Sequence, residues 1–306
     1  MERQNKIKGI VLVMGASSIF GLMPLFARIG INNGLNTITI VMFRSLFAMM
    51  ILGVYMRQKK MSIRVEKKYW KDLFMVSTFG YGLMVLTLFY SYLYMPTGIA
   101  TTIHFVYPAV VLLGCVTIYK EKLTIEKLLA VVAALVGIYL LSVDDTGFSL
   151  HPWGFFLAFI SGVLYAYYIL KVSYSTIREM NAYKLVFYIS MFNFIYFFIT
   201  ALLTNQLSMQ VTWIGYLDMV VLAVCSVLAM AAFKTGLTYI TSWSGAILSS
   251  FEPVTSIIIG VILFNESFQG RNMAGSLIII IAVVYIAWIE KKSSAISIQQ
   301  EAEVVN

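Results

Sequence analysis

Two long stretches of this chain repeat each other at a constant distance along the sequence. Each repeated residue recurs 145 positions later, at the matching point of a matching hydrophobic segment. The repeated pairs are Gly9 and Gly154, Tyr94 and Tyr239, Pro108 and Pro253, and Glu121 and Glu266. Self-similarity at a fixed spacing is the mark of a protein built from copies of one structural unit. The spacing therefore predicts two halves of similar structure.

The composition places both halves in a membrane. Hydrophobic residues make up 60% of the 306 residues, charged residues only 12%, and the mean hydropathy is +0.86. Soluble domains are about one-quarter charged. Apolar runs long enough to span a bilayer recur along almost the whole chain, and the longest polar stretch runs only from Arg57 to Asp72. The sequence therefore predicts an all-α polytopic membrane protein.

The apolar segments divide into ten predicted transmembrane helices. The predicted spans are 8–31, 36–56, 72–94, 97–119, 124–143, 152–173, 182–203, 213–238, 243–264 and 271–290. Turn-forming residues separate several of them, as at Asn32-Asn33-Gly34, Pro96-Thr97-Gly98 and 265–270. The predicted domains are a first five-helix repeat at 1–147, a second at 148–292, and a disordered cytoplasmic tail at 293–306.

The basic residues predict the orientation. Of the 22 lysines and arginines, 18 lie on one predicted side of the membrane: Arg3, Lys6, Lys8, Arg57, Lys59, Lys60, Arg64, Lys67, Lys68, Lys71, Lys120, Lys122, Lys127, Lys171, Arg178, Lys184, Lys291 and Lys292. By the positive-inside rule, both termini are then cytoplasmic. Because five spans is an odd number, the second repeat must cross the membrane in the opposite sense. The prediction is therefore two inverted five-helix repeats, with a shared site near mid-membrane.

Several motifs resemble one known family. Phe251-Glu252-Pro253-Val254, Phe264-Asn265-Glu266 and Phe43-Arg44-Ser45-Leu46 resemble stretches of the EamA-type drug/metabolite transporters. Gly21 also resembles that family, although Phe20 stands where a tryptophan usually precedes the glycine. The resemblance covers about residues 8–290. It implies a ten-helix bacterial transporter with cytoplasmic termini and a cavity lined by helices 1, 3, 4, 6, 8 and 9, which handles amino acids, nucleotide precursors or other metabolites, often as an exporter.

Glu252 is the sharpest candidate for solute or proton binding. It stands about ten residues into the ninth predicted span, where a charge costs about 2.5–3.5 kcal/mol and needs a partner, water or a proton. Ser249 lies on the same helical face. The alternative is a structural carboxylate bonded to a neighbouring helix.

His104 and Tyr107 are the repeat counterparts of Ser249 and Glu252, because each pair is separated by the same 145 residues. Pro108 and Pro253 follow them and interrupt backbone hydrogen bonding at matching points. His104 is the only histidine within a predicted span, and an unperturbed imidazole titrates near neutral pH. It is predicted to bind solute or protons, or to be satisfied by a neighbour.

Other residues complete the predicted site. Arg44 is expected to anchor helices or form an interhelical salt bridge, and Gly21 to allow close helix packing. Lys234 is expected to snorkel, with a cavity-mouth cation or a partner for Glu252 as alternatives. Cavity-wall aromatics are predicted at Tyr81, Tyr90, Tyr165 and Trp243.

The predicted function is secondary active transport of small metabolites across a bacterial plasma membrane by alternating access. Export of amino acids or related compounds is preferred, with proton or exchange coupling. A channel, a sensory receptor and an integral membrane lipid-modifying enzyme are the alternatives. The sequence has no phosphate-binding loop, catalytic triad or metal-ligand spacing, so no enzyme activity, cofactor or metal is expected. Solute and membrane lipids are the expected partners, without nucleic acid, and the oligomeric state stays open.

Overall fold

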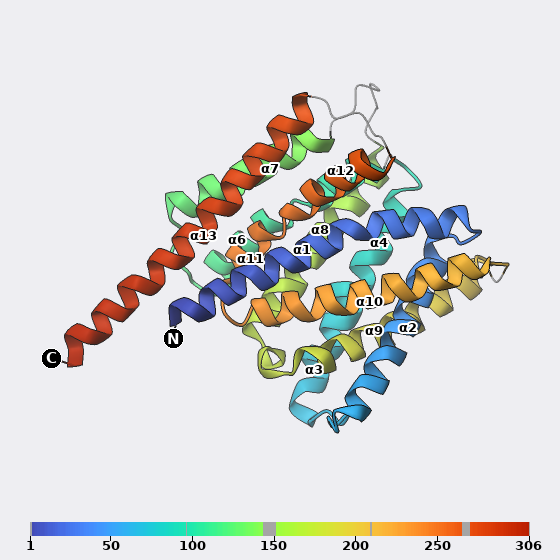
Figure 1. Cartoon of the computed structure of the whole chain (residues 1–306), viewed down its shortest axis with the longest axis horizontal. Coiled ribbons are helices and arrows are strands. Elements are labelled where there is room, and N and C mark those ends of the chain that lie inside the picture. Colours follow the sequence, from blue (N-terminus) through green and yellow to red (C-terminus); the bar gives the residue numbers. More distant parts are fainter. Residues whose placement is uncertain (1, 96, 143–150, 209, 265–269, 306) are drawn as a thin grey trace.

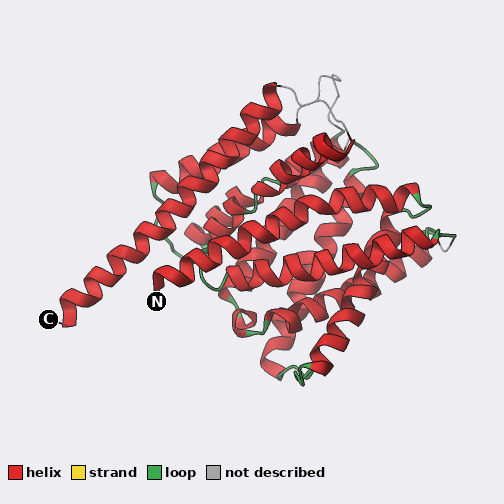
Figure 2. Cartoon of the chain, in the orientation of Figure 1, coloured by secondary structure: helices red, strands yellow, loops and turns green. Residues whose placement is uncertain are grey.

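The computed structural model describes residues 2–95, 97–142, 151–208, 210–264 and 270–305. All regular elements of these residues are helices, as the colouring of Figure 2 shows. Their arrangement is a bundle in which segments far apart in the sequence lie side by side (Figure 1). The expected all-α fold is therefore confirmed.

Each half of the chain supplies five helical segments in the same order. The first half contains α1 (Glu2–Asn32), α2 (Thr37–Gln58), α3 (Lys67–Met75) with the π-helix η1 (Val76–Gly82) and α4 (Leu83–Ser91), α5 (Thr97–His104) with α6 (Tyr107–Thr117), and α7 (Ile125–Ser142). The second half contains α8 (Pro152–Tyr174), the 3-10 turn η2 (Thr176–Glu179), α9 (Ala182–Leu203), α10 (Trp213–Gly236), α11 (Ser242–Leu248) with α12 (Phe251–Phe264), and α13 (Gly270–Val305).

Nine segments of the described residues are long and apolar enough to cross a membrane. They match nine of the ten predicted spans. The remaining predicted span, 124–143, corresponds to α7, an apolar helix of 18 residues whose C-terminal end adjoins residues outside the described part. The fourth and ninth spans are each broken near the middle, between α5 and α6 and between α11 and α12.

The contacts between helices repeat in the two halves of the chain. Helix α2 packs against its counterpart α9, and α7 packs against its counterpart α13. Helix α1 packs against α10, just as its counterpart α8 packs against α4 and η1. Figure 1 shows α7 beside α13 on one flank of the bundle and α2 beside α9 on the other. This pattern is a pseudo-two-fold arrangement of the two halves.

The repeated glycines mark equivalent contacts. A Cβ atom on Gly9 would lie 2.7 Å from the Cβ of Tyr239, and one on Gly154 would lie 2.9 Å from the Cβ of Tyr94. Both distances are shorter than real Cβ contacts allow, so only glycine lets these helices approach so closely. All four residues belong to pairs that are 145 positions apart. The repeat seen in the sequence is thus also a repeat of tertiary contacts.

The helix starts repeat as well. The Asn36 side chain accepts a hydrogen bond from the Thr39 backbone N–H at 2.9 Å and caps α2. Its counterpart Asn181 accepts one from the Tyr183 N–H at 3.0 Å and caps α9. Asparagine suits this position because its side-chain oxygen satisfies an amide that has no partner within the helix.

Two segments differ from the expectations. The third predicted span contains η1, whose wide turn brings Gly80 against the Tyr168 side chain and Gly82 against Asn193. Such π-turns accommodate a local mismatch in packing within an otherwise regular helix. The tail at 293–306 was expected to be disordered, but α13 continues to Val305. That stretch contains no glycine or proline that would end a helix.

Candidate functional site

The two broken helices meet in the middle of the bundle. Helix α5 ends at His104 and α6 begins at Tyr107, while α11 ends at Leu248 and α12 begins at Phe251. Pro108 and Pro253 stand in the first turns of α6 and α12, where a residue without an N–H is tolerated. Discontinuous helices at matching positions of an inverted repeat are typical of transporter binding sites. The site is therefore built around these two interruptions.

A hydrogen bond joins the two interruptions directly. The Tyr107 hydroxyl lies 2.9 Å from Ser249 Oγ, and both residues are buried. Ser249 Oγ is also 2.9 Å from the Ala246 carbonyl, which must accept its single hydrogen. Tyr107 therefore donates to Ser249. Since the two residues belong to different repeats, this bond ties α6 to α11.

His104 is held by the second repeat. Its Nδ1 lies 2.9 Å from Ser161 Oγ on α8, and Ser161 gives its hydrogen to the Ala158 carbonyl at 2.6 Å. Ser161 must therefore accept, so Nδ1 carries a hydrogen and donates it. Nε2 has no hydrogen-bond partner among the described residues. In a neutral imidazole of this tautomer, Nε2 is free to accept a proton.

Aromatic rings form a continuous cluster around this histidine. The rings of Tyr107 and Tyr165 are 4.8 Å apart, and that of His104 lies 5.5 Å from Tyr165. Tyr165 also stacks on Tyr168 at 5.7 Å, which in turn contacts Tyr81 at 5.7 Å. Predicted site residues His104, Tyr107, Tyr165 and Tyr81 are thus in one cluster, the aromatic cluster. Ring faces of this kind attract cations and flat apolar groups.

Glu252 lies beside the aromatic cluster in the first turn of α12, where backbone N–H groups favour a carboxylate. Its charge interacts electrostatically with Tyr92, Tyr107 and Tyr165. Across the described residues, its carboxylate has no hydrogen bond or salt bridge. The structural alternative, a carboxylate bonded to a neighbouring helix, is therefore not what the described contacts show. Glu252 is thus a carboxylate at the interruption without a partner among the described side chains.

Two glycines let neighbouring helices pack closely against backbone carbonyls at these interruptions. A Cβ on Gly21 would lie 2.6 Å from the Glu252 carbonyl oxygen, and one on Gly162 would lie 2.5 Å from that of His104. Gly21 thus lies at a close contact between α1 and α12. Each interrupted helix therefore packs against a glycine of a neighbouring helix.

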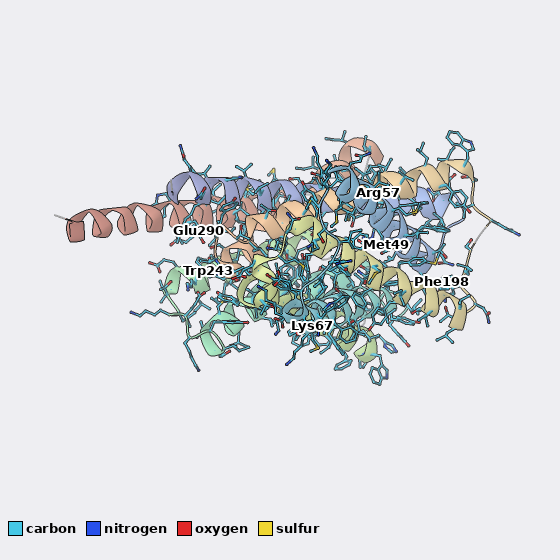
Figure 3. The ribbon with its side chains drawn as sticks, turned by 90° about the horizontal axis from the view of Figure 1, so that it is seen from below. Met49, Arg57, Lys67, Phe198, Trp243 and Glu290 are labelled. Atoms are coloured by element: carbon cyan, nitrogen blue, oxygen red, sulfur yellow. The ribbon has the colours of Figure 1, made fainter. Side chains whose placement is uncertain are left out.

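Two predicted binding residues lie elsewhere. Lys234 is buried and donates from Nζ to the Arg178 carbonyl at 2.6 Å, so it does not pair with Glu252. Trp243 is buried at the start of α11, where Lys127 Nζ lies 5.1 Å from its ring centre. Figure 3 shows Trp243 and Glu290 at the same end of the molecule. Helical spacing alone did not reveal that this tryptophan is more than one turn from the interruption.

The other two predicted residues have separate surroundings. Tyr90 is half-buried on α4 and is not among the described rings that contact the aromatic cluster. Arg44 is half-buried, and its Nη1 reaches the Met23 sulfur of α1 at 4.0 Å. No carboxylate of the described residues lies within ion-pair distance of Arg44. The contact with Met23 fits a helix anchor, whereas the predicted salt bridge is not found there.

Sequence reasoning missed Ser161, Tyr168 and Tyr92. Ser161 positions His104, Tyr168 connects Tyr165 to Tyr81, and Tyr92 lies near Glu252. Tyr165 and Tyr168 are three residues apart, a spacing that places both on one helix face, so this signal was available in the sequence. No sequence signal marked Ser161, because small residues are common along these helices and nothing distinguished this one.

A second polar cluster lies at the end of the bundle that carries the termini. We call it the terminal face, made by Lys6, Glu121, Lys127, Tyr174, Thr241, Trp243 and Glu290. Glu121 accepts hydrogen bonds from the Tyr174 hydroxyl and, at 2.9 Å, from Lys127 Nζ. Glu290 accepts from the Thr241 hydroxyl at 2.7 Å and pairs with Lys6 at 3.4 Å. Two of these contacts, Glu121 with Tyr174 and Glu290 with Lys6, join one repeat to the other.

A pocket of about 270 Å³ opens at the terminal face between the repeats. Its polar lining comes from side chains of both charges together with serine and threonine hydroxyls. The lining includes Lys6, Glu121, Ser173, Arg178, Thr241 and Glu290. The pocket leads to the start of α11, the half-helix that ends at the central interruption.

A comparison with known families decides what this architecture is. The model of the EamA-like transporter family matches residues 7–143 and again residues 152–288. Both bounds of the second match lie 145 residues after those of the first, so the family unit is the repeat described above. The chain belongs to the EamA-like transporter family. It is therefore a multi-pass membrane transporter of small molecules.

Structure comparison agrees on the fold. Twenty-nine chains of solved structures match, and one of them, described as "Crystal structure of protein", aligns with a TM-score of 0.79. That chain shares 13% sequence identity, and the alignment covers 92% of this chain and 98% of the other. Nothing among curated proteins matches the sequence. The structural likeness at this identity concerns the fold alone.

Proposed function

We propose that this EamA-like transporter is a secondary active exporter of amino acids or related compounds, coupled to protons or to exchange. It works by alternating access in a bacterial plasma membrane, with both termini in the cytoplasm. The observation that carries the proposal is Glu252, a carboxylate without a described partner, at the meeting point of two interrupted helices. A half-buried charge within a membrane-spanning helix is retained where it binds a proton or a cationic group.

The surroundings of Glu252 fit an amino acid. Its carboxylate and the faces of Tyr107 and Tyr165 suit a solute ammonium group. The aromatic cluster provides a wall for an apolar side chain. These groups come from both repeats, so movement of one repeat against the other would change the site.

The test is transport by purified protein in liposomes. Vesicles loaded with an amino acid mixture are diluted, and the efflux of each compound is followed with and without a proton gradient. Glu252→Gln should lower the rate by about 100-fold or more, because it removes the group that binds the proton or the ammonium. Glu179→Gln, an exposed carboxylate in η2, is the matched control and should behave as the parent protein.

The opposite results are equally informative. Efflux by Glu252→Gln at the parental rate would refute a binding role for this carboxylate. Ion currents that require no counter-flow would support the channel alternative. Folded protein that moves no compound of the mixture would refute the proposed solute class.

A further inference from the structure

The pseudo-two-fold relation gives the Tyr107–Ser249 hydrogen bond a specific counterpart. The repeat counterpart of Tyr107 is Glu252, and that of Ser249 is His104, each 145 residues away. The bond that joins the repeats in this structure is therefore equivalent, by symmetry, to a contact between Glu252 and His104. That contact is absent from the structure: His104 bonds Ser161, and Glu252 has no described partner.

In a transporter of two inverted repeats, the two access states are related by exchange of the repeat conformations. The first repeat adopts in one state the conformation that the second repeat adopts in the other, because the units have the same fold but opposite orientation. Each contact between repeats in one state then occurs between the counterpart residues in the other state. The Tyr107–Ser249 contact would accordingly be replaced by the Glu252–His104 contact.

The present surroundings of both residues fit such an exchange. The His104 ring lies only 5.6 Å from that of Tyr107, which is itself within electrostatic range of Glu252. Nδ1 of His104 is used by Ser161, so Nε2 is the nitrogen available for a new partner. The counterpart of Ser161 is Ala16, which has no hydroxyl, so Ser249 has no equivalent alternative partner there. In this structure, Ser161 thus bonds Nδ1 of His104 and leaves Nε2 without a hydrogen-bond partner among the described residues.

We propose that the contacts of the terminal face close it in this structure, that Glu252 and His104 form a direct hydrogen-bonded pair in the state open at that face, and that this pair is the proton-binding site of the transporter. The proton lies between the carboxylate and Nε2. It arrives from the water that enters at the terminal face, and it leaves when the Tyr107–Ser249 bond forms again. The inference deepens the proposed function, on which it rests, by assigning the proton to a pair that exists in only one state.

Few other titratable groups face this pair. Among the described residues, the titratable side chains within electrostatic range of Glu252 are Tyr92, which follows α4, Tyr107 on α6 and Tyr165 on α8. Helices α1 and α13 also pack against α12, and no hydrogen bond or ion pair is found between Glu252 and their titratable residues of known placement, which are Lys6, Lys8, Arg28, Arg271, Tyr285 and Glu290. On α11 and α2, the nearest candidates are the side chains of Ser249, which does not titrate, and Arg44, which contacts Met23. The site therefore offers one carboxylate and one imidazole for one proton.

The experiment is cross-linking of symmetry-related cysteine pairs. In a background without native cysteines (C115S/C225S), Y107C/S249C reports the present contact and H104C/E252C reports its counterpart. A short bifunctional thiol reagent is used, because the length of a tyrosine side chain separates the backbones by more than a disulfide spans. Each pair is combined with Y174F, which removes a terminal-face hydrogen bond to Glu121, or with Y167F, whose hydroxyl has no described partner.

With Y174F, cross-linking of H104C/E252C should rise several-fold while that of Y107C/S249C falls by a similar factor. Y167F should change neither. Parallel changes in both pairs, or no H104C/E252C cross-link with either variant, would overturn the inference. Because cross-linking needs no transport, this result is independent of the liposome assay. Proton release on solute binding, measured with a pH-sensitive dye in weakly buffered detergent, should disappear in both H104F and E252Q, and its persistence in either would also overturn the inference.

Discussion

The two ends of this bundle share a backbone plan but differ in their side-chain contacts. At the terminal face, the α2–α3 and α8–α9 loops contact each other, as where Lys184 donates to the Arg64 carbonyl at 3.0 Å. We call the other end the distal face; it includes Asn33, Thr39, Gln206 and Thr212. There the equivalent loops are joined by a hydrogen bond, which the Thr39 hydroxyl donates to the Gln206 carbonyl at 2.9 Å. These peripheral contacts therefore follow the symmetry.

The central contacts do not follow it. Tyr174, which bonds Glu121 at the terminal face, has Ile29 as its distal counterpart, and the counterpart of Trp243 is Gly98. Neither an isoleucine nor a glycine can make the corresponding polar contact. The comparison teaches that the symmetric backbone places equivalent loops in contact at both ends, while asymmetric side chains give the terminal face polar contacts that have no counterpart at the distal face.

The largest expected effect tests the symmetric part of this comparison. Gly9→Val and Gly154→Val should each remove most of the folded protein, because even a Cβ would come within 3 Å of a neighbouring side chain. Fluorescence-detected size-exclusion chromatography would measure the folded fraction. Gly15→Val is the control, since no atom lies within 4 Å of its added Cβ. A large loss at one glycine with none at the other would break the proposed equivalence of the two ends.

A smaller effect is expected at the terminal face, where the side-chain contacts are asymmetric. In a C225S background, Cys115 is the remaining thiol; it is buried, and its sulfur lies 3.7 Å from the Tyr174 hydroxyl. Tyr174→Phe should raise the rate of Cys115 labelling by a water-soluble maleimide several-fold, because it weakens the closure of the terminal face. Tyr167→Phe serves as the control. If labelling stays at the parental rate, the Tyr174–Glu121 contact does not keep this face closed.

The smallest effect concerns the helix caps. Asn36→Ala and Asn181→Ala should each destabilise the protein by about 1 kcal/mol, because each leaves one amide at a helix start without its partner. Asn36→Ala should cost more, because the Asn36 side-chain nitrogen also donates to the Gln206 carbonyl at 2.6 Å. Thermal unfolding in detergent would show both midpoints lowered, with the larger fall for Asn36→Ala. An equal or smaller fall for Asn36→Ala would show that this distal contact adds no stability.

Much of the site could be predicted from the repeat spacing. The spacing related His104 to Ser249 and Tyr107 to Glu252, and the structure brings His104, Tyr107 and Ser249 together where the two interruptions meet, with Glu252 beside them. The positions of Trp243 and Lys234 could not be predicted in the same way. Residues a few turns apart on a helix lie at different depths, and only the packing of neighbouring helices shows which depth holds the site.

The amino-acid sequence by itself determined the apolar segments, their number and the 145-residue repeat, because hydrophobic length and spacing are local properties of the chain. Only the tertiary structure decided that Tyr107 bonds Ser249 while Glu252 and His104 stay apart. The repeat is compatible with either contact, since symmetry makes them equivalent. Long-range polar contacts such as that of Tyr174 with Glu121 break this symmetry, because the counterpart of Tyr174 is Ile29, and such contacts exist only once the two halves have packed.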